Sequence, residues 1–209
     1  MPIVRIARHG ETTWNVEGRY QGRLESELSP LGVRQADALA QALRSTATTR
    51  IICSPLHRTR MTARPISALL GVPIEEDVRL IEIAHGTWEG RLRDELARND
   101  PQRYRAWRSH PETVAFENGE SIAQVWERWS AFASDFQVDR ETLIVTHDAI
   151  VRLAILAGAS RPLEDFWKAK VVNGGYAQFS VERSTWVLDS ECVDDFLAGL
   201  HADLARQAL

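Results

Sequence analysis

The chain has 209 residues, of which 44% are hydrophobic and 26% charged; this composition excludes a disordered or fibrous protein and is sufficient to bury a core. Its formal net charge of -4 argues against broad electrostatic binding to nucleic acid or to an anionic membrane, because both need a basic face. We therefore expect one domain over residues 1–209 that captures any anionic ligand locally.

The first part of the chain alternates short apolar runs with helical patterns. The predicted elements are a buried strand over Pro2–Ala7, a helix that begins at Ser29-Pro30 and extends to Leu43, a buried strand over Arg50–Cys53, and a helix from Arg58 to Leu70 that ends at Gly71. Ser29 is the expected helix cap, with Pro30 in the first turn. This alternation of strands and helices favours an α/β fold.

The second part of the chain begins with a segment that has weak periodicity. Residues 88–117 are rich in arginine, acid and tryptophan, and we interpret them as a helical insertion. The elements predicted after it are a helix over Ser121–Phe136, a strand over Thr142–Thr146 that leads into His147, a helix that ends at Gly158, a hairpin over Ala177–Glu182 and Thr185–Leu188, and a last helix with Val193, Phe196, Leu197, Leu200 and Leu204 on one face. The whole pattern predicts a three-layer α/β/α sandwich with a mainly parallel central sheet.

No apolar run approaches the roughly 20 residues that span a bilayer, and the initial run Ile3–Ala7 is too short for a signal peptide. We therefore expect a cytoplasmic protein. Cys53 and Cys192 are its two cysteines, and in that compartment we expect no disulfide between them.

Polar residues follow three of the predicted strands. These strand ends carry Arg8-His9-Gly10, then Ser54 to Arg58, and finally His147-Asp148. Ligands of open α/β sheets bind beyond the carboxyl ends of the strands, so the two arginines and two histidines are expected to enclose one phosphoryl group. Taken alone, an Arg-His-Gly tripeptide is a weak signal.

The chain has further histidines, which could act in catalysis or bind a metal. His57, His110 and His201 are expected at the surface or in packing, whereas His85 lies near a candidate acid and is equally compatible with a loop position. No pair of histidines or carboxylates has the helical spacing of a zinc site, and the chain has no cysteine cluster, so no metal is expected.

Several motifs together resemble the histidine phosphatase superfamily, the phosphoglycerate mutase-like group. The matching residues lie between about residues 3 and 152 and are Arg8-His9-Gly10-Glu11-Thr12, Asn15, Gly18-Arg19, Gln21-Gly22, Leu28-Ser29, Gly32, Ser54-Pro55-Leu56-His57-Arg58-Thr59, Thr62-Ala63, Glu82, Gly86, Trp88-Glu89-Gly90, Asn118-Gly119-Glu120-Ser121 and Val145-Thr146-His147. The resemblance also implies an antiparallel strand at the edge of the sheet.

The resemblance implies a role for each matching residue. His9 would attack phosphorus and become phosphohistidine, and Glu82 would protonate the leaving oxygen and later activate water. The phosphoryl oxygens would be held by Arg8, Arg58 and His147, with substrate contacts from Asn15, Gln21, Gly22 and Asp148. No cofactor is implied, and the implied activity is hydrolysis of a small phosphorylated metabolite.

Asp148 departs from the pattern of this branch, which has glycine after the second histidine. One interpretation gives Asp148 a share of the acid role, as in the acid phosphatase branch of the superfamily. The other, which we favour, makes Asp148 the cap of the helix that begins at Ala149, because aspartate is frequent at caps.

Two other functions use the same residues. A cofactor-dependent phosphoglycerate mutase would need a longer insertion with more basic residues than Arg91 to Glu117 provides, and a non-catalytic domain for phosphorylated ligands would be expected to lose one of the key residues. The substrate is left open: the arginines of the insertion are read mainly as a solvated face, and Trp88 and Trp107 as packing residues. A homodimer is also left open.

Overall fold

A six-stranded sheet forms the centre of the protein, of which the computed structural model describes residues 2–208. The strands are β1 (Ile3–Arg8), β2 (Arg50–Cys53), β3 (Ile74–Glu76), β4 (Thr142–Thr146), β5 (Tyr176–Glu182) and β6 (Thr185–Val193), in the order β3-β2-β4-β1-β5-β6. The first four are mutually parallel, and the β5–β6 hairpin adds two antiparallel strands next to β1. The predicted mainly parallel sheet with an antiparallel edge is thus confirmed.

The burial of each strand follows from its place in the sheet. Every residue of β4 is buried, as an apolar strand covered on both faces requires, whereas β5 alternates between buried and partly exposed residues. The edge strand β6 is nowhere fully buried. The residue pattern of each strand therefore fits its position: strands with continuous apolar runs lie at the centre of the sheet, and strands with alternating patterns lie on its antiparallel side.

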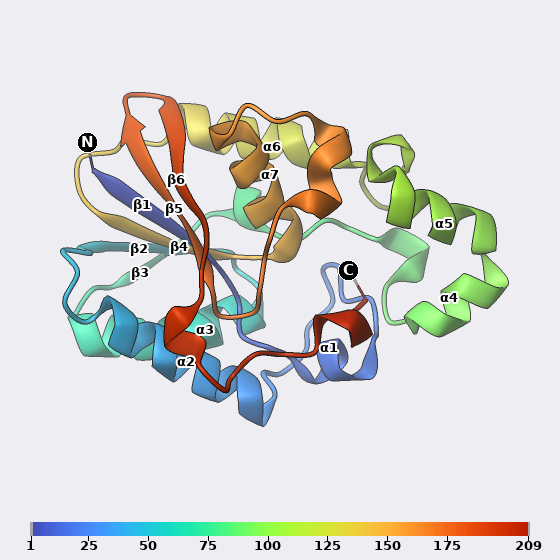
Figure 1. Cartoon of the computed structure of the whole chain (residues 1–209), viewed down its shortest axis with the longest axis horizontal. Helices are drawn as coiled ribbons and strands as arrows, with labels where there is room; N and C mark the ends of the chain where they lie inside the picture. Colours follow the sequence, from blue (N-terminus) through green and yellow to red (C-terminus); the bar gives the residue numbers. More distant parts are fainter. Residues whose placement is uncertain (1, 209) are drawn as a thin grey trace.

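Helices cover both faces of this sheet, as Figure 1 shows, with α2 and α3 on one side and α6 and α7 on the other. The helices are α1 (Thr13–Glu17), α2 (Pro30–Leu43), α3 (His57–Leu70), α4 (Arg93–Asn99), α5 (Pro101–Ser109), α6 (Ile122–Asp135) and α7 (Asp148–Gly158). Short 3-10 turns occur at Val78–Leu80, Gly86–Trp88, Pro111–Thr113, Leu163–Lys168, Asp195–Leu197 and Leu204–Arg206. The three predicted layers are confirmed.

Local capping explains where these helices begin and end. The Ser29 side chain accepts a hydrogen bond from the amide of Gly32, with Pro30 in the first turn of α2, as predicted. Helix α3 ends at Gly71 in the left-handed region, with φ 67°. Ser121 caps α6 through a capping box with Gln124.

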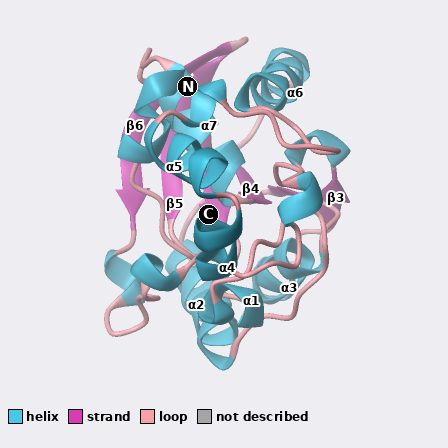
Figure 2. Ribbon diagram, turned by 90° about the vertical axis from the view of Figure 1, so that its right-hand side faces the viewer, coloured by secondary structure: helices cyan, strands magenta, loops and turns pink. Residues whose placement is uncertain are grey.

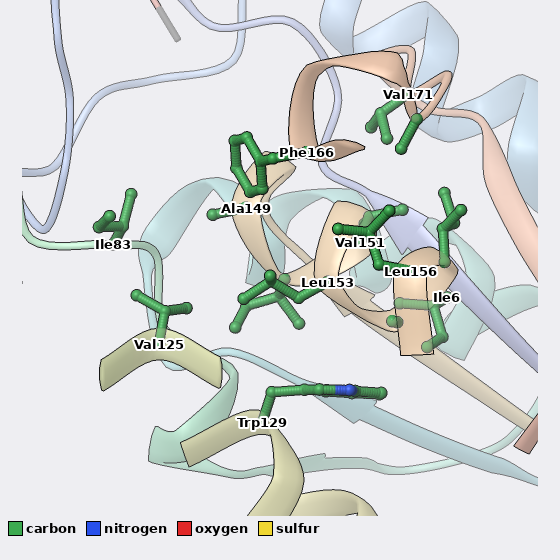
Figure 3. Packing of buried hydrophobic residues seen from close by; sticks show 14 of the residues in the cluster. Ile6, Ile83, Val125, Trp129, Ala149, Val151, Leu153, Leu156, Phe166 and Val171 are labelled. Atoms are coloured by element: carbon green, nitrogen blue, oxygen red, sulfur yellow. The ribbon is translucent and has the colours of Figure 1, made fainter. Parts of the chain in front are cut away.

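Two hydrophobic cores lie on either side of the sheet. One is formed by α2 and α3 and includes Leu39 and Ile66; the larger one is formed by α6 and α7 and includes Trp129 and Leu153. Figure 3 shows Trp129 below α7, with Leu153 and Leu156 directed toward the same interior. Burial of this apolar surface fixes α7, and with it the polar residues at its first turn.

Two features of the fold differ from the sequence-based prediction. The predicted last helix is wrong: β6 continues to Val193, which pairs with Tyr176, and the residues after it form only two 3-10 turns. Gly199 between those turns has φ 74°, a conformation that cannot continue an α-helix. Strand β3 was not predicted, because it is a three-residue edge strand with two exposed positions.

After β6 the chain returns to the end of the sheet at which β1 ends and α1 follows. Its last turn, Leu204–Arg206, lies against α1, and the Ala205 carbonyl accepts a hydrogen bond from Arg93 at the start of α4. In Figure 2, which faces the end where α4 and α5 project, the C-terminus lies toward the viewer at this end. None of the helices within residues 2–208 combines the length and apolarity needed to cross a bilayer, and Cys53 and Cys192 are free thiols.

Candidate active site

Neighbouring strands place the two key histidines side by side. Arg8 at the end of β1 is in register with Thr146 at the end of β4, and the His9 amide donates to the Thr146 carbonyl at 3.0 Å. His9 and His147 therefore leave the sheet together, with their ring centroids 5.3 Å apart. The predicted meeting of strand ends forms a pocket whose walls include Arg8, His9, Arg58, Glu82 and Asp148.

His9 presents one ring nitrogen to this pocket as a free base. Its Nδ1 lies 2.7 Å from the Gly10 carbonyl oxygen, which can only accept, so Nδ1 carries the proton and Nε2 has the lone pair. Burial, together with the charges of Arg58 and Arg8, lowers the pKa of His9 well below its ordinary value. The imidazole is therefore neutral and nucleophilic at neutral pH.

The backbone behind His9 is closely packed. The Gly10 amide donates to the Thr62 hydroxyl at 3.0 Å, and a Cβ on Gly10 would lie only 2.5 Å from the carbonyl oxygen of Gly32. Glycine is therefore required at position 10 by the approach of α2 rather than by its φ angle.

Two buried guanidinium groups face His9. Arg58 donates to the carbonyls of Gly22 at 2.7 Å and Leu24 at 2.9 Å, and burial lowers its pKa to about 10, still far above neutrality. Arg8 donates to the Gln207 side-chain oxygen at 2.7 Å and forms an ion pair with Asp148 at 3.3 Å. Both remain cationic at neutral pH, and such planar groups suit phosphoryl oxygens.

His147 is held by a serine from the neighbouring strand end. Its Nε2 lies 2.7 Å from the Ser54 hydroxyl, and its Nδ1 has no hydrogen-bond partner among residues 2–208. Burial and then the charge of Arg58 lower the pKa of His147 well below 6.5. Burial and the surrounding positive charge therefore favour the neutral form of His147.

Glu82 lies after the 3-10 turn Val78–Leu80 and points its carboxyl group at the start of α7. Its Oε1 accepts from the amides of Ile83 at 2.9 Å and Ala149 at 3.3 Å. Burial, and secondly the charge of Asp148, raise the pKa of Glu82 above its ordinary value of 4.5. A raised pKa suits a group that donates a proton and takes it back.

Asp148 is the first residue of α7 and does not cap it. The cap position is His147, and no side chain makes a capping hydrogen bond there, so the favoured cap interpretation is wrong. The Asp148 carboxylate instead pairs with Arg152, one turn on, at 2.6 Å and with Arg8 at 3.3 Å. Burial opposes ionisation, but Arg152 and Arg8 outweigh it and lower the pKa of Asp148, the opposite of what a proton donor needs.

The remaining predicted contacts line the same pocket. The Asn15 side-chain oxygen accepts from the amide and hydroxyl of Thr12, which fixes the side chain in α1. The Gln21 side-chain oxygen accepts from the Ser26 hydroxyl at 2.5 Å. Gly22 has φ 51°, and a Cβ there would collide with the carboxylate of Glu89. Asn15, Gln21 and Gly22 therefore form part of the pocket wall, whereas the predicted phosphate contact His147 lies beside His9 without lining the pocket.

The other four histidines lie at the surface or in the pocket wall. The side chains of His57, His110 and His201 are 39%, 70% and 50% exposed, and each lies within 4 Å of a carboxylate, as expected for surface residues. His85, which the sequence left open, is buried in the pocket wall. No group of three or more histidine, cysteine or acidic side chains between residues 2 and 208 is arranged to hold a metal ion.

Two residues of the site were missed from the sequence. Gln207 is 4% exposed and bridges Arg8 to Asn173, donating to the Asn173 side-chain oxygen at 2.7 Å. Asn173 in turn donates to the His9 carbonyl at 3.2 Å. Neither lies in a local motif: Asn173 precedes β5, which pairs with β1, whereas Gln207 reaches Arg8 only because the chain after β6 returns to this end of the sheet.

A neutral histidine base, two guanidinium groups and a carboxyl group of raised pKa line one pocket, and such a set of groups can bind a phosphoryl group and take part in its transfer. The chain belongs to the histidine phosphatase superfamily (branch 1), whose family model matches residues 4–193.

Several known proteins resemble most of this chain. Phosphoserine phosphatase 1 of Hydrogenobacter thermophilus is 34% identical over 180 residues, covering 85% of each chain. Adenosylcobalamin/alpha-ribazole phosphatase of Escherichia coli is 30% identical over 181 residues, covering 85% of this chain and 89% of its own. The structure of Bacillus stearothermophilus YhfR superposes with a TM-score of 0.86 at 30% identity, over 91% of this chain and 96% of that one.

Proposed function

We propose that this protein hydrolyses phosphate monoesters of small metabolites through a phosphohistidine on His9. In the first step the bond from His9 Nε2 to phosphorus forms, the ester P–O bond breaks, and the carboxyl proton of Glu82 passes to the leaving oxygen. In the second step water attacks phosphorus, the N–P bond breaks, and the Glu82 carboxylate takes the water proton. Relatives named as phosphatases of small phosphorylated compounds support this function.

One observation carries the proposal. The hydrogen bond from His9 Nδ1 to the Gly10 carbonyl at 2.7 Å leaves Nε2 unprotonated inside a pocket that holds the cations of Arg8 and Arg58. A nucleophile of this kind splits the reaction into two transfers, so the mechanism requires no metal-bound hydroxide. The fixed guanidinium groups stabilise the charge that develops on the phosphoryl oxygens.

The charges of the pocket favour hydrolysis over a mutase reaction. Among the described residues that line it, the cationic side chains are Arg8 and Arg58, both next to His9. A phosphoglycerate mutase also has to hold a second phosphate and a carboxylate, and such anions need further cationic partners when they are desolvated. We therefore propose that the phosphoryl group passes to water.

The test is a quenched reaction with a ³²P-labelled monoester. Wild type is expected to carry acid-labile, base-stable label on His9, and His9→Asn is expected to lose both the label and phosphate release. His57→Asn serves as the control, because His57 is a surface histidine next to a carboxylate, and it should keep both. Turnover that persists in His9→Asn, or wild-type turnover without labelled protein, would refute the proposal.

A further inference from the structure

The pocket has two chemically different halves. The half around His9 is polar and cationic, through Arg8 and Arg58, and suits the phosphoryl group. The other half is lined by apolar side chains, among them Ile83, Trp107, Phe166, Trp167 and Ala208. Figure 3 shows Phe166 next to Ala149 at the start of α7, with Ile83 on the facing segment. A monoester bound with its phosphorus at His9 places its alcohol portion in this apolar half.

His85 is the polar side chain of that half. It is 5% exposed, and neither of its ring nitrogens has a hydrogen-bond partner among residues 2–208. Its ring is instead surrounded edge-to-face by Tyr20, Trp107 and Phe116, at centroid distances of 5.0, 5.7 and 4.8 Å. A buried polar group without a partner is destabilising, so a phenyl ring would be more stable at this position.

The backbone holds His85 in place. Its amide donates to the Glu89 carboxylate at 3.0 Å, and it directly precedes the 3-10 turn Gly86–Trp88. Burial, and secondly the charge of Arg58, lower the pKa of His85 to about 3, so the imidazole is neutral at physiological pH. A neutral imidazole has one N–H donor and one nitrogen acceptor, and residues 2–208 use neither of them at His85.

The two cations of the pocket leave no donor for a second anion, because their free nitrogens hold the phosphoryl group in the proposed mechanism and their other nitrogens have partners in the protein. Arg58 donates to the carbonyls of Gly22 and Leu24, and Arg8 is held between Gln207 and Asp148. A carboxylate on the alcohol portion would therefore lose its hydration without gaining an ionic partner. A flat, uncharged ring would instead replace water against Trp107 and Phe166.

We propose that His85 is a specificity residue and that the protein prefers monoesters of uncharged aromatic or heterocyclic alcohols, whose ring exchanges a hydrogen bond with the imidazole. This inference rests on the proposed phosphatase function and narrows its substrate class. It explains why a buried imidazole with unused nitrogens occupies an aromatic wall: the missing partner is part of the substrate.

Three esters of primary alcohols test the proposal. Pyridin-3-ylmethyl phosphate has a flat ring with a hydrogen-bond acceptor, benzyl phosphate has the ring alone, and phosphoserine has a charged alcohol portion. We expect kcat/KM to decrease in that order. His85→Phe keeps an aromatic ring without nitrogens and should lower kcat/KM for the pyridine ester about tenfold, the value of one hydrogen bond, while benzyl phosphate changes by less than about threefold.

The control and the stability measurement separate specificity from folding. His110→Phe makes the same chemical change on an exposed residue, 70% exposed at its side chain, and should leave the order of the three esters intact. His85→Phe should unfold at the same or a higher urea concentration than wild type, because it removes an unpaired polar group.

Two results would count against the inference in different ways. Phosphoserine turnover at a kcat/KM equal to or above that of the ring esters, or equal losses for both ring esters in His85→Phe, would overturn the substrate class while labelled His9 still forms. If none of the three esters releases phosphate and His9 stays unlabelled, the phosphatase function itself is overturned.

Discussion

Replacing Asp148 by asparagine removes a buried charge and keeps the shape of the side chain. The Asp148 side chain is 6% exposed, and its carboxylate lies 2.6 Å from Arg152 Nε and 3.3 Å from Arg8 Nη1. Removing one partner of a buried ion pair costs about 3–5 kcal/mol. Because asparagine retains one acceptor oxygen, we expect the lower end, about 3 kcal/mol, which is roughly a hundredfold decrease in the folding constant at 1.4 kcal/mol per tenfold.

Urea unfolding followed by tryptophan fluorescence measures this loss, and its pH dependence tests the cause. Since Arg152 and Arg8 hold the pKa of Asp148 below 3.8 in the folded protein, its contribution is present above that pH and is lost as pH falls through the lower folded-state pKa. The difference between wild type and Asp148→Asn should therefore shrink in acid. A variant within about 0.5 kcal/mol of wild type at pH 7, the value of a surface pair, would refute the buried-pair reasoning.

Three further outcomes follow from the site and the core. Glu82→Gln should lower kcat about 10²–10⁴-fold for alkyl esters but much less for p-nitrophenyl phosphate, and equal losses on both esters would argue against proton donation. In the wild type, the falling limb of the kcat–pH profile should lie above pH 4.5, because the pKa of Glu82 is raised. Gly10→Ala should lower both kcat and stability, the latter by about 1–3 kcal/mol, because its Cβ meets the Gly32 carbonyl, whereas Gly71→Ala, with open space around it, should keep its kcat. Trp129→Ala should reduce the unfolding free energy by about 3–5 kcal/mol in urea titrations while leaving kcat at 15 °C within about twofold, and a larger kcat loss would place Trp129 in the site instead.

The parts of the fold that could be predicted from sequence are those that local chemistry determines. Strands β1, β2 and β4 are short apolar runs that end in polar residues, and α2 and α6 have serine caps followed by helical spacing. The apolar spacing after Val193 misled the prediction, because Leu197 packs as a single buried residue of a 3-10 turn rather than on a helix face. Helical spacing over few turns does not by itself establish a helix.

The residues of the site also differ in how far the sequence predicts them. His9, Arg58 and His147 carry their signal in neighbouring residues, so the sequence brought them together through the strand ends they follow. Gln207 contacts Arg8 across 199 positions of the chain and has no motif of its own. The lack of hydrogen-bond partners at the His85 ring and the pairing of Asp148 with Arg152 depend on the side chains that surround them, and only the folded chain supplies those neighbours.

The pairing of Arg8 with Thr146 makes the spacing of the two histidines a property of the backbone ladder. Adjacent strands lie about 4.8 Å apart whatever side chains they carry, so repacking of the cores leaves His9 and His147 at the same separation until β1 and β4 come apart. Heat inactivation should then coincide with cooperative unfolding of the sheet, without a folded but inactive state at a lower temperature.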